Sequence, residues 1–186
     1  IERLQHSGDW AATGEILSRA AQHIEAGGAD FLLICTNTMH KVAYPVAAAV
    51  KIPLLHIADA TGKALRQAGI ERVGLLGTAF TMEQDFYKGR LTQKFGLEVI
   101  VPNEDDRRQV HDVIYHELCL GIIKPESKQS FVEVVDRLAN TGAQAVILGC
   151  TEIGLLINQA DTAVPLYDTT LIHAEAAVDL AVSPSP

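Results

Sequence analysis

Long apolar runs, basic clusters and paired cysteines are missing from this sequence, and each lack argues against a class of protein. No apolar run reaches the roughly 18 residues that a membrane-spanning helix needs. No segment gathers Lys and Arg, and the net charge of −8 argues against nucleic acid as a partner. The three cysteines are an odd number and lie far apart, so they favour a reducing, cytoplasmic location over a disulfide scaffold.

The first residue is Ile1 rather than Met, and it lies in a polar stretch of helical character. The basic and then apolar stretch of a leader peptide does not open the chain. We therefore expect the natural N-terminus to lie upstream of Ile1. With 48% hydrophobic and 20% charged residues over 186 positions, the chain otherwise has the composition of an ordinary globular protein.

What the sequence does contain is an alternation of short apolar runs with longer segments of helical period. This alternation is typical of parallel βαβ units, so we predict an α/β fold. The predicted strands are residues 31–34, 53–57, 73–76, 97–101, 145–148 and 164–167. The predicted helices are residues 10–26, 38–50, 61–68, 80–95, 107–120, 126–141 and 171–182. We expect residues 183–186 to be frayed.

One block of sequence occurs twice. Gly-Ala-Asp-Phe-Leu-Leu-Ile-Cys-Thr at 28–36 resembles Gly-Ala-Gln-Ala-Val-Ile-Leu-Gly-Cys-Thr at 142–151, and a second pair of blocks, 52–59 and 164–168, follows in the same order. Two matched blocks in one order indicate duplicated α/β halves. We predict two similar parallel-sheet domains related by a pseudo-dyad, which are residues 1–59 with the returning segment 168–186, and residues 60–167.

Cys35 and Cys150 each follow the strand of their own block. In open parallel sheets, ligands bind beyond the carboxyl ends of the strands, so a pseudo-dyad would bring the two thiols face to face across one cleft. Moving a proton from one face of an α-carbon to the other needs an acid and a base that exchange roles after each turnover, and two thiols meet that need. Each cysteine also precedes a predicted helix start, where the helix dipole favours a thiolate.

The residues around the two cysteines resemble those of a known family. Cys-Thr-Asn-Thr-Met-His at 35–40 and Gly-Cys-Thr-Glu-Ile at 149–153 are similar to the paired signatures of the aspartate/glutamate racemase family. Thr-Met-Glu-Gln-Asp-Phe-Tyr at 81–87 and Asp-Thr-Thr-Leu-Ile-His-Ala at 168–174 resemble its broad-specificity amino-acid racemase branch. The similarity extends over nearly the whole chain.

The resemblance implies an amino-acid racemase or epimerase that needs neither pyridoxal phosphate nor a metal ion, consists of two similar α/β domains and is often a homodimer. It also implies that Cys35 and Cys150 exchange the proton at the α-carbon. The residues that it places around the amino acid are Thr36, Asn37, Thr38, Thr151 and Glu152. Family members begin with a first strand and a glycine-rich loop that line the same cleft. Nothing in this chain matches them, so we expect that strand and loop to be missing.

Other residues that could carry chemistry have simpler interpretations. Cys119 lies on a predicted helix with apolar neighbours, and we expect it to pack in the core or at its boundary. A zinc site is disfavoured because Cys35 and His40 do not have the spacing of a close ligand pair and no second pair exists. The histidines expected on exposed helical faces are His6, His23, His111 and His116.

Some interpretations stay open at the level of sequence. Glu152 is either a first-turn helix acid or a group that meets the substrate ammonium or the adjacent thiol. His56 and His173 either tune the thiols or are structural, and the structural interpretation is favoured. Lys124 is a weak candidate for binding an acidic side chain. The Gly-Leu-Leu-Gly-Thr stretch at 74–78 lacks the lysine of a P-loop, so we expect a plain strand-to-helix turn whose last two residues face the cleft.

Two other functions remain as alternatives. A related two-thiol enzyme would isomerise maleate, racemise hydantoins or decarboxylate malonates, although decarboxylation needs only one proton donor. A catalytically incomplete protein would instead bind a small acid without turnover.

Overall fold

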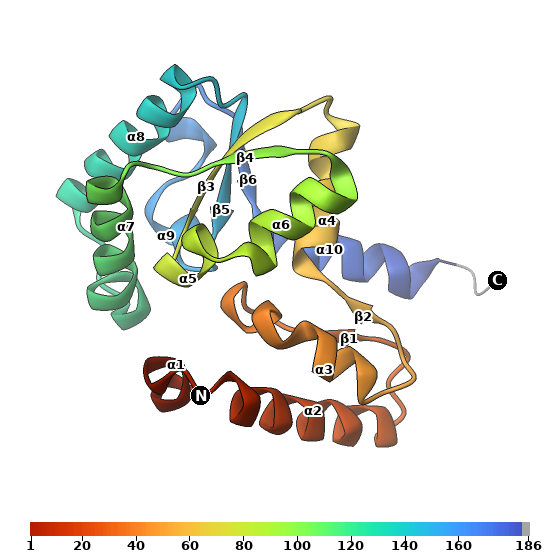
Figure 1. The fold of residues 1–186 in the computed structure, drawn as a ribbon. Coiled ribbons are helices and arrows are strands. Elements are labelled where there is room, and N and C mark those ends of the chain that lie inside the picture. The colour runs from red at the N-terminus through yellow and green to blue at the C-terminus, as the bar shows by residue number, and fades with distance from the viewer. Residues whose placement is uncertain (184–186) are drawn as a thin grey trace.

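The computed structural model describes residues 1–183 and shows two parallel β-sheets surrounded by helices (Figure 1). The smaller sheet has the order β1-β2 and the larger one the order β4-β3-β5-β6, and each neighbouring pair is parallel. The strands are β1 (Leu32–Leu33), β2 (Leu54–Leu55), β3 (Arg72–Gly77), β4 (Glu98–Ile100), β5 (Ala145–Gly149) and β6 (Leu166–Asp168). The predicted α/β fold with parallel sheets is confirmed.

Helices connect the strands and cover both faces of the larger sheet. The α-helices are α1 (Glu2–Ser7), α2 (Trp10–Ala26), α3 (Ala43–Ala48), α4 (Ile57–Gln67), α5 (Ala79–Glu83), α6 (Asp85–Phe95), α7 (Glu104–His116), α8 (Pro125–Asn140), α9 (Ile153–Leu156) and α10 (Thr169–Val182). The 3₁₀ helices are η1 (Thr38–Val42), η2 (Leu118–Leu120) and η3 (Gln159–Asp161). Within residues 1–183, no helix combines the length and the hydropathy that a membrane crossing requires.

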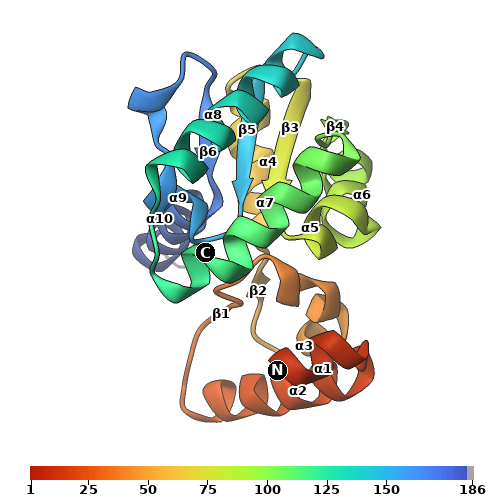
Figure 2. The ribbon, with the colours of Figure 1, turned by 90° about the vertical axis from the view of Figure 1, so that its left-hand side faces the viewer.

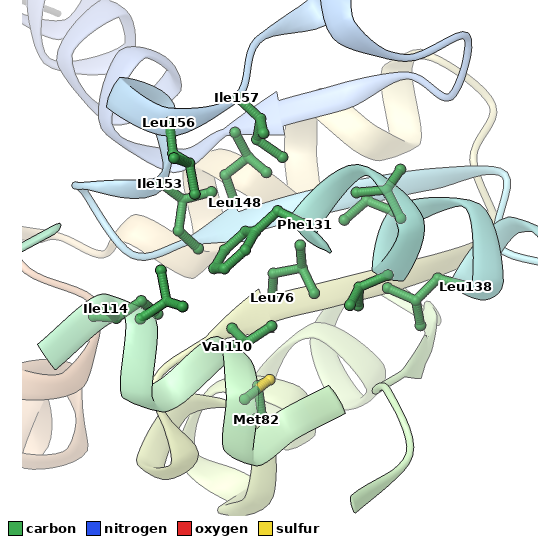
Figure 3. Close-up of a cluster of buried hydrophobic side chains, with 14 of the residues drawn as sticks. Leu76, Met82, Val110, Ile114, Phe131, Leu138, Leu148, Ile153, Leu156 and Ile157 are labelled. Carbon is green, nitrogen blue, oxygen red and sulfur yellow. The ribbon is translucent and has the colours of Figure 1, made fainter. Parts of the chain in front are cut away.

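The strands of the larger sheet bury side chains on both faces, as their continuous apolar sequence predicts. On β3, Leu75 joins a cluster with α4 and α6, whereas its neighbour Leu76 joins a cluster with α7, α8 and α9. Figure 3 shows the second cluster, in which Phe131 of α8 lies close to Leu76 and Leu148. Figure 2 shows α7 and α8 in front of β3 and β5, with α4 behind them. This two-sided packing fixes the carboxyl ends of β3 and β5.

The smaller sheet has its own apolar core. Leu32 of β1 packs with Met39, Val42 and Val46, which follow it in η1 and α3, and with Ala21 of α2. In Figure 1, α2 and α3 lie below this sheet, away from the larger one. Asp9 begins α2 because its side chain accepts a 3.0 Å hydrogen bond from the Ala12 N–H, and the helix ends before Gly27, so the predicted bounds of this helix are confirmed.

Two predicted strands, 31–34 and 53–57, are wrong in length, because β1 and β2 have two residues each. The second ends early because His56 is the N-cap of α4, and its Nδ1 accepts a 3.2 Å hydrogen bond from the Ala58 N–H. The helix predicted at 61–68 therefore begins earlier, at Ile57. The segment predicted as one helix at 38–50 is a 3₁₀ turn followed by a short α-helix.

The helix predicted at 80–95 is also wrong, since it is broken at Gln84, whose backbone is extended. The break has a packing reason. Met82 of α5 is buried in the cluster with α7, whereas Tyr87 of α6 is buried in the cluster on the opposite face of the sheet. Residues 184–186, predicted to be frayed, lie outside the described residues. The domain boundaries, the pseudo-dyad and the upstream strand stay predictions.

Candidate active site

A cavity of about 260 Å³ lies at the carboxyl ends of β1, β3 and β5. It collects residues from segments that are far apart in the sequence, as expected for the ligand-binding edge of parallel sheets. Its lining residues are Gln5, Cys35, Thr36, Asn37, Thr38, Thr78, Ile114, Tyr115, Cys119, Gly149, Cys150, Thr151 and Glu152. The structure thus brings together both cysteines and all five of the predicted substrate-contacting residues.

The two cysteines enter the cavity from different sheets. Cys35 follows β1 and is exposed, whereas Cys150 follows β5 and is half-buried. The approach of β3 and β5 behind Cys150 depends on a pair of glycines, Gly77 and Gly149, which are neighbours in the strand register. A Cβ atom on Gly149 would lie 2.7 Å from the carbonyl oxygen of Leu76, which is closer than real Cβ atoms approach. A side chain at this position would displace the strand end that carries Cys150.

Cys150 has a carboxylate partner. Its Sγ donates a hydrogen bond of 2.9 Å to Oε2 of Glu152, and the Thr151 hydroxyl donates to the same oxygen at 2.7 Å. Burial, and after it the Glu152 carboxylate, raises the pKa of the Cys150 thiol. The expectation that a helix dipole favours a thiolate is therefore wrong here, because α9 is a single turn and desolvation outweighs it. Cys150 is held in its protonated form.

Asn37 lines the cavity and has a buried side-chain acceptor without a hydrogen-bond partner in residues 1–183. Its side chain is 3% exposed, and Nδ2 donates a 3.0 Å hydrogen bond to the Thr169 hydroxyl, which in turn donates to the Leu148 carbonyl. These two bonds fix the orientation of the amide, so that Nδ2 faces Thr169 and Oδ1 faces away from it. Oδ1 is buried and has no partner within the described residues. A buried acceptor without a partner is costly, so this atom is suited to a donor on a ligand.

Three threonine hydroxyls meet at the boundary between the two sheets. Oγ1 of Thr38 lies 3.2 Å from Oγ1 of Thr78 and 3.5 Å from Oγ1 of Thr81. Thr78 lines the cavity, in agreement with the expectation that it faces the cleft, whereas Gly77 does not line it. Hydroxyl groups can reorient and donate to an anion, so Thr38 and Thr78 offer donors for a carboxylate.

Cys119 is where the sequence interpretation was wrong. It was expected to pack in the core or at its boundary, but it is exposed and lines the cavity together with Tyr115. After α7 ends at His116, the chain tightens into η2, which buries Leu118 and leaves Cys119 open to the cavity. Tyr115 and Cys119 are four residues apart, and this helical spacing is the signal that could have grouped them. No comparable pattern in the sequence identifies Gln5 of α1 as a residue of the cavity.

The histidines divide into exposed and structural groups. His6, His23 and His116 are exposed, as predicted. His111 is half-buried, contrary to expectation, because its Nδ1 accepts a 3.1 Å hydrogen bond from the Ala79 N–H at the start of α5. His56 is buried as the cap of α4 and does not line the cavity.

Two further candidates lie away from the cavity lining. His173 is buried, and its Nε2 lies 2.8 Å from the Leu55 carbonyl oxygen. Lys124 pairs with Glu117 at 3.0 Å. Over residues 1–183, no cluster of three His, Cys, Asp or Glu side chains is arranged to hold a metal ion.

The chain is similar to known racemases over almost its entire length. Residues 1–177 match the sequence profile described as Asp/Glu/Hydantoin racemase. The chain is 52% identical to an Asp/Glu racemase candidate from Yersinia pestis, with a TM-score of 0.92 over 98% of this chain and 79% of that one. It is 35% identical to an aspartate racemase homologue from Pyrococcus horikoshii OT3, with a TM-score of 0.85 over 97% of this chain and 79% of that one.

A curated relative is more distantly similar to this chain. The chain is 24% identical over 161 residues to the broad specificity amino-acid racemase RacX of Bacillus subtilis (strain 168). The match covers 85% of this chain and 67% of that protein.

Proposed function

Because this chain belongs to the Asp/Glu/hydantoin racemase family, we propose that it is a cofactor-independent amino-acid racemase or epimerase in which Cys35 and Cys150 exchange the α-proton. The observation that carries the proposal is that the two thiols line one cavity of about 260 Å³, which is large enough for a small amino acid. Two like groups that exchange roles allow the reaction to run in both directions.

The environment of Cys150 supports a starting role for this thiol in the proposed reaction. Cys150 begins as the acid, because burial and its hydrogen bond to Glu152 favour the protonated thiol. The thiolate of Cys35 then removes the α-proton from one face of the substrate, and the electron pair of the broken C–H bond stays on the α-carbon. Cys150 gives its proton to the opposite face of that carbanion. The turnover leaves Cys35 protonated and Cys150 as the thiolate, which is the starting state of the reverse reaction.

Asn37 and the threonine hydroxyls hold the amino acid between the thiols. The free Oδ1 of Asn37 accepts a hydrogen bond from the substrate ammonium group. The hydroxyls of Thr38 and Thr78 donate to the α-carboxylate, where negative charge increases as the proton leaves. Thr36 and Thr151 also line the cavity and add two polar side chains around the amino acid.

We also propose a family branch, an oligomeric state, a cellular location and a domain division for this enzyme. We place it in the broad-specificity branch of the family, on the motifs at 81–87 and 168–174 and the similarity to RacX. We infer a homodimer from the family resemblance alone. We infer a reducing cytoplasm because the three cysteines are free and both catalytic groups must be reduced thiols. Residues 1–59 with 168–186 form the first domain and residues 60–167 the second, with the cavity between them.

The test is α-proton exchange in D₂O by the full-length protein with a panel of amino acids, followed by ¹H NMR. We expect deuterium at the α-carbon with the wild type and a loss of about 10³-fold or more in Cys35→Ser and in Cys150→Ser, because serine is a far weaker acid and base at neutral pH. Cys119→Ser is the matched control, since it changes a thiol of the same cavity that has no assigned proton to carry. Unimpaired exchange in either catalytic variant would contradict the proposal.

The same assay separates the alternative functions. Turnover of maleate, hydantoins or malonates with no turnover of amino acids would mean that the site catalyses one of these related reactions instead. Tight binding of an amino acid without α-proton exchange would identify a non-catalytic binding protein. Titration of thiol reactivity distinguishes the latter, because a binding protein has no need of a reactive thiolate at Cys35.

A further inference from the structure

His40 uses both nitrogens of its ring, although it does not line the cavity. It lies in η1, five residues after Cys35, and its side chain is 3% exposed. Nδ1 lies 2.8 Å from the carbonyl oxygen of Thr36. The backbone N–H of Ile57 donates to Nε2 at 3.1 Å. The ring therefore joins the loop after β1 to the first residue of α4.

These two hydrogen bonds define one protonation state. Because Nε2 accepts from a backbone N–H, it carries no proton, and the single proton of the neutral ring lies on Nδ1 and is donated to the Thr36 carbonyl. The groups that surround the ring are His56, with ring centroids 4.3 Å apart, and His173, at 6.1 Å. Burial, with smaller contributions from His173 and then Arg90, lowers the pKa of His40 to about 4, so the neutral form is retained at neutral pH.

The loop that His40 contacts has a second anchor at Asn37, whose Nδ2 donates a hydrogen bond to the Thr169 hydroxyl. Its strand, β1, is only two residues long, and the Thr36 N–H bonds locally to the Ile34 carbonyl. Cys35 itself is exposed. Ile57, at the other end of the bridge, is 1% exposed and belongs to the apolar cluster beneath the larger sheet. The bridge thus connects the loop that carries the exposed Cys35 to a well-packed part of the fold.

We propose that His40 is a positioning residue for the Cys35 half of the site, because its neutral ring ties the Thr36 carbonyl to the N-terminus of α4 and so fixes the direction of Cys35. This role rests on the proposed function of Cys35 as a proton-transfer group. His40 touches no reacting atom. It acts through the loop, whose small displacements would change the distance between the thiol and the α-proton.

Three variants of His40 separate positioning from general stability. Asn places an amide at the position of Nδ1 and can keep the bond to Thr36. Gln reaches the position of Nε2 and can keep the bond to Ile57. Phe keeps the ring shape and loses both bonds. If the bond to the loop matters most, activity falls in the order wild type, His40→Asn, His40→Gln, His40→Phe, whereas a purely structural role would make activity follow thermal stability.

Racemisation kinetics of the full-length protein supply the first readout. We expect kcat to fall by about 10²-fold in His40→Phe, as for a small misplacement of a catalytic group, with KM changed by less than about threefold. His173→Gln is the matched control, because His173 is a buried histidine bonded to a carbonyl outside this loop. A wild-type kcat in His40→Phe, or an equal loss of kcat in His173→Gln at equal loss of Tm, would overturn the proposal.

Amide hydrogen exchange of the peptide covering residues 33–40 supplies a readout that needs no enzymatic activity. We expect exchange about tenfold faster in His40→Phe than in the wild type, and close to wild type in His40→Asn. If no amino acid is racemised by the wild type, the proposed function fails, and this measurement still decides whether His40 anchors the loop. Unchanged exchange in His40→Phe would refute the anchoring role itself.

Discussion

Sγ of Cys150 donates a hydrogen bond to Oε2 of Glu152 across 2.9 Å. The two residues are separated only by Thr151, so the turn after β5 places a half-buried thiol and a carboxylate side by side. A carboxylate next to a thiol disfavours the thiolate, and burial acts in the same direction. Cys35 has no such partner and is exposed. The duplicated Cys-Thr blocks therefore place two thiols in unlike environments.

Removing the charge of Glu152 should make Cys150 more acidic. In Glu152→Gln we expect the pKa of Cys150 to fall, because the second cause of its elevation is lost while the first, burial, remains. Each unit of that fall increases the thiolate fraction about tenfold at pH values below the pKa. Iodoacetamide labelling of Cys150 as a function of pH, followed by mass spectrometry, measures the shift.

Glu126→Gln is the control for that variant, since Glu126 is exposed at the start of α8 and outside the cavity. Labelling of Cys150 should match the wild type in this control. An unchanged labelling profile in Glu152→Gln would mean that the carboxylate does not act on the thiol.

Asn37 should contribute to binding more than to the chemical step. Asn37→Ala removes the free Oδ1 acceptor, and a hydrogen bond to a charged group contributes about 1.5–3 kcal/mol, so we expect KM to rise by roughly 10- to 100-fold. The ammonium group is present in both ground and transition states, so kcat should change little. Asn140→Ala, on the exposed end of α8, is the control. A loss confined to kcat would place Asn37 in the proton transfer instead.

Gly149 should tolerate no side chain. In Gly149→Ala the new Cβ would lie 2.7 Å from the Leu76 carbonyl oxygen, and we expect a loss of about 1–3 kcal/mol in the free energy of unfolding from overpacking. Urea unfolding measures this loss, and α-proton exchange should fall with it because Cys150 is the next residue. Gly89→Ala is the matched control, since its Cβ would lie 3.6 Å from Asp85 Cβ in helix α6, where alanine is favoured by about 0.5–1 kcal/mol. Equal stability of the two variants would contradict the close approach of β3 and β5.

Acid should destabilise the protein through its buried histidines. Burial lowers the pKa of His40 from 6.5 to about 4 and that of His56 from 6.5 to about 2. Because the unfolded chain then binds protons more readily, the stability that neutral His40 contributes is present above pH 6.5 and is lost as the pH falls toward 4. For His40 the loss is on the order of 3 kcal/mol between pH 7 and pH 4.

Urea unfolding across this pH range checks the histidine contribution. His40→Asn should lose less stability between pH 7 and pH 4 than the wild type, whereas a variant of the exposed His6, His6→Gln, should behave as the wild type does. If His40→Asn and the wild type lose stability equally, His40 is not the titrating group.

Local sequence signals predict uninterrupted helices and strands well. Helix α2 has the bounds that the sequence predicts, and the apolar runs give β3 and β5 with little error. The cysteine pair is also accessible from sequence, because repetition of a block indicates a shared position at the ends of parallel strands.

What the sequence does not predict depends on contacts between distant segments. The break at Gln84 follows from the need of Met82 and Tyr87 to reach opposite faces of one sheet, which periodicity alone does not encode. The exposure of Cys119 depends on how η2 turns, and the pKa of Cys150 depends on burial that the final packing sets. Such features arise from tertiary structure, so local patterns cannot supply them.

The most direct test of the two-thiol account follows one enantiomer of a substrate in D₂O at low conversion with the full-length protein. If Cys35 removes the proton and Cys150 supplies another from the opposite face, the first product molecules carry solvent deuterium while the remaining substrate keeps its original proton. Product that retains the substrate's own proton, or turnover that persists in the double variant Cys35→Ser with Cys150→Ser, would contradict it.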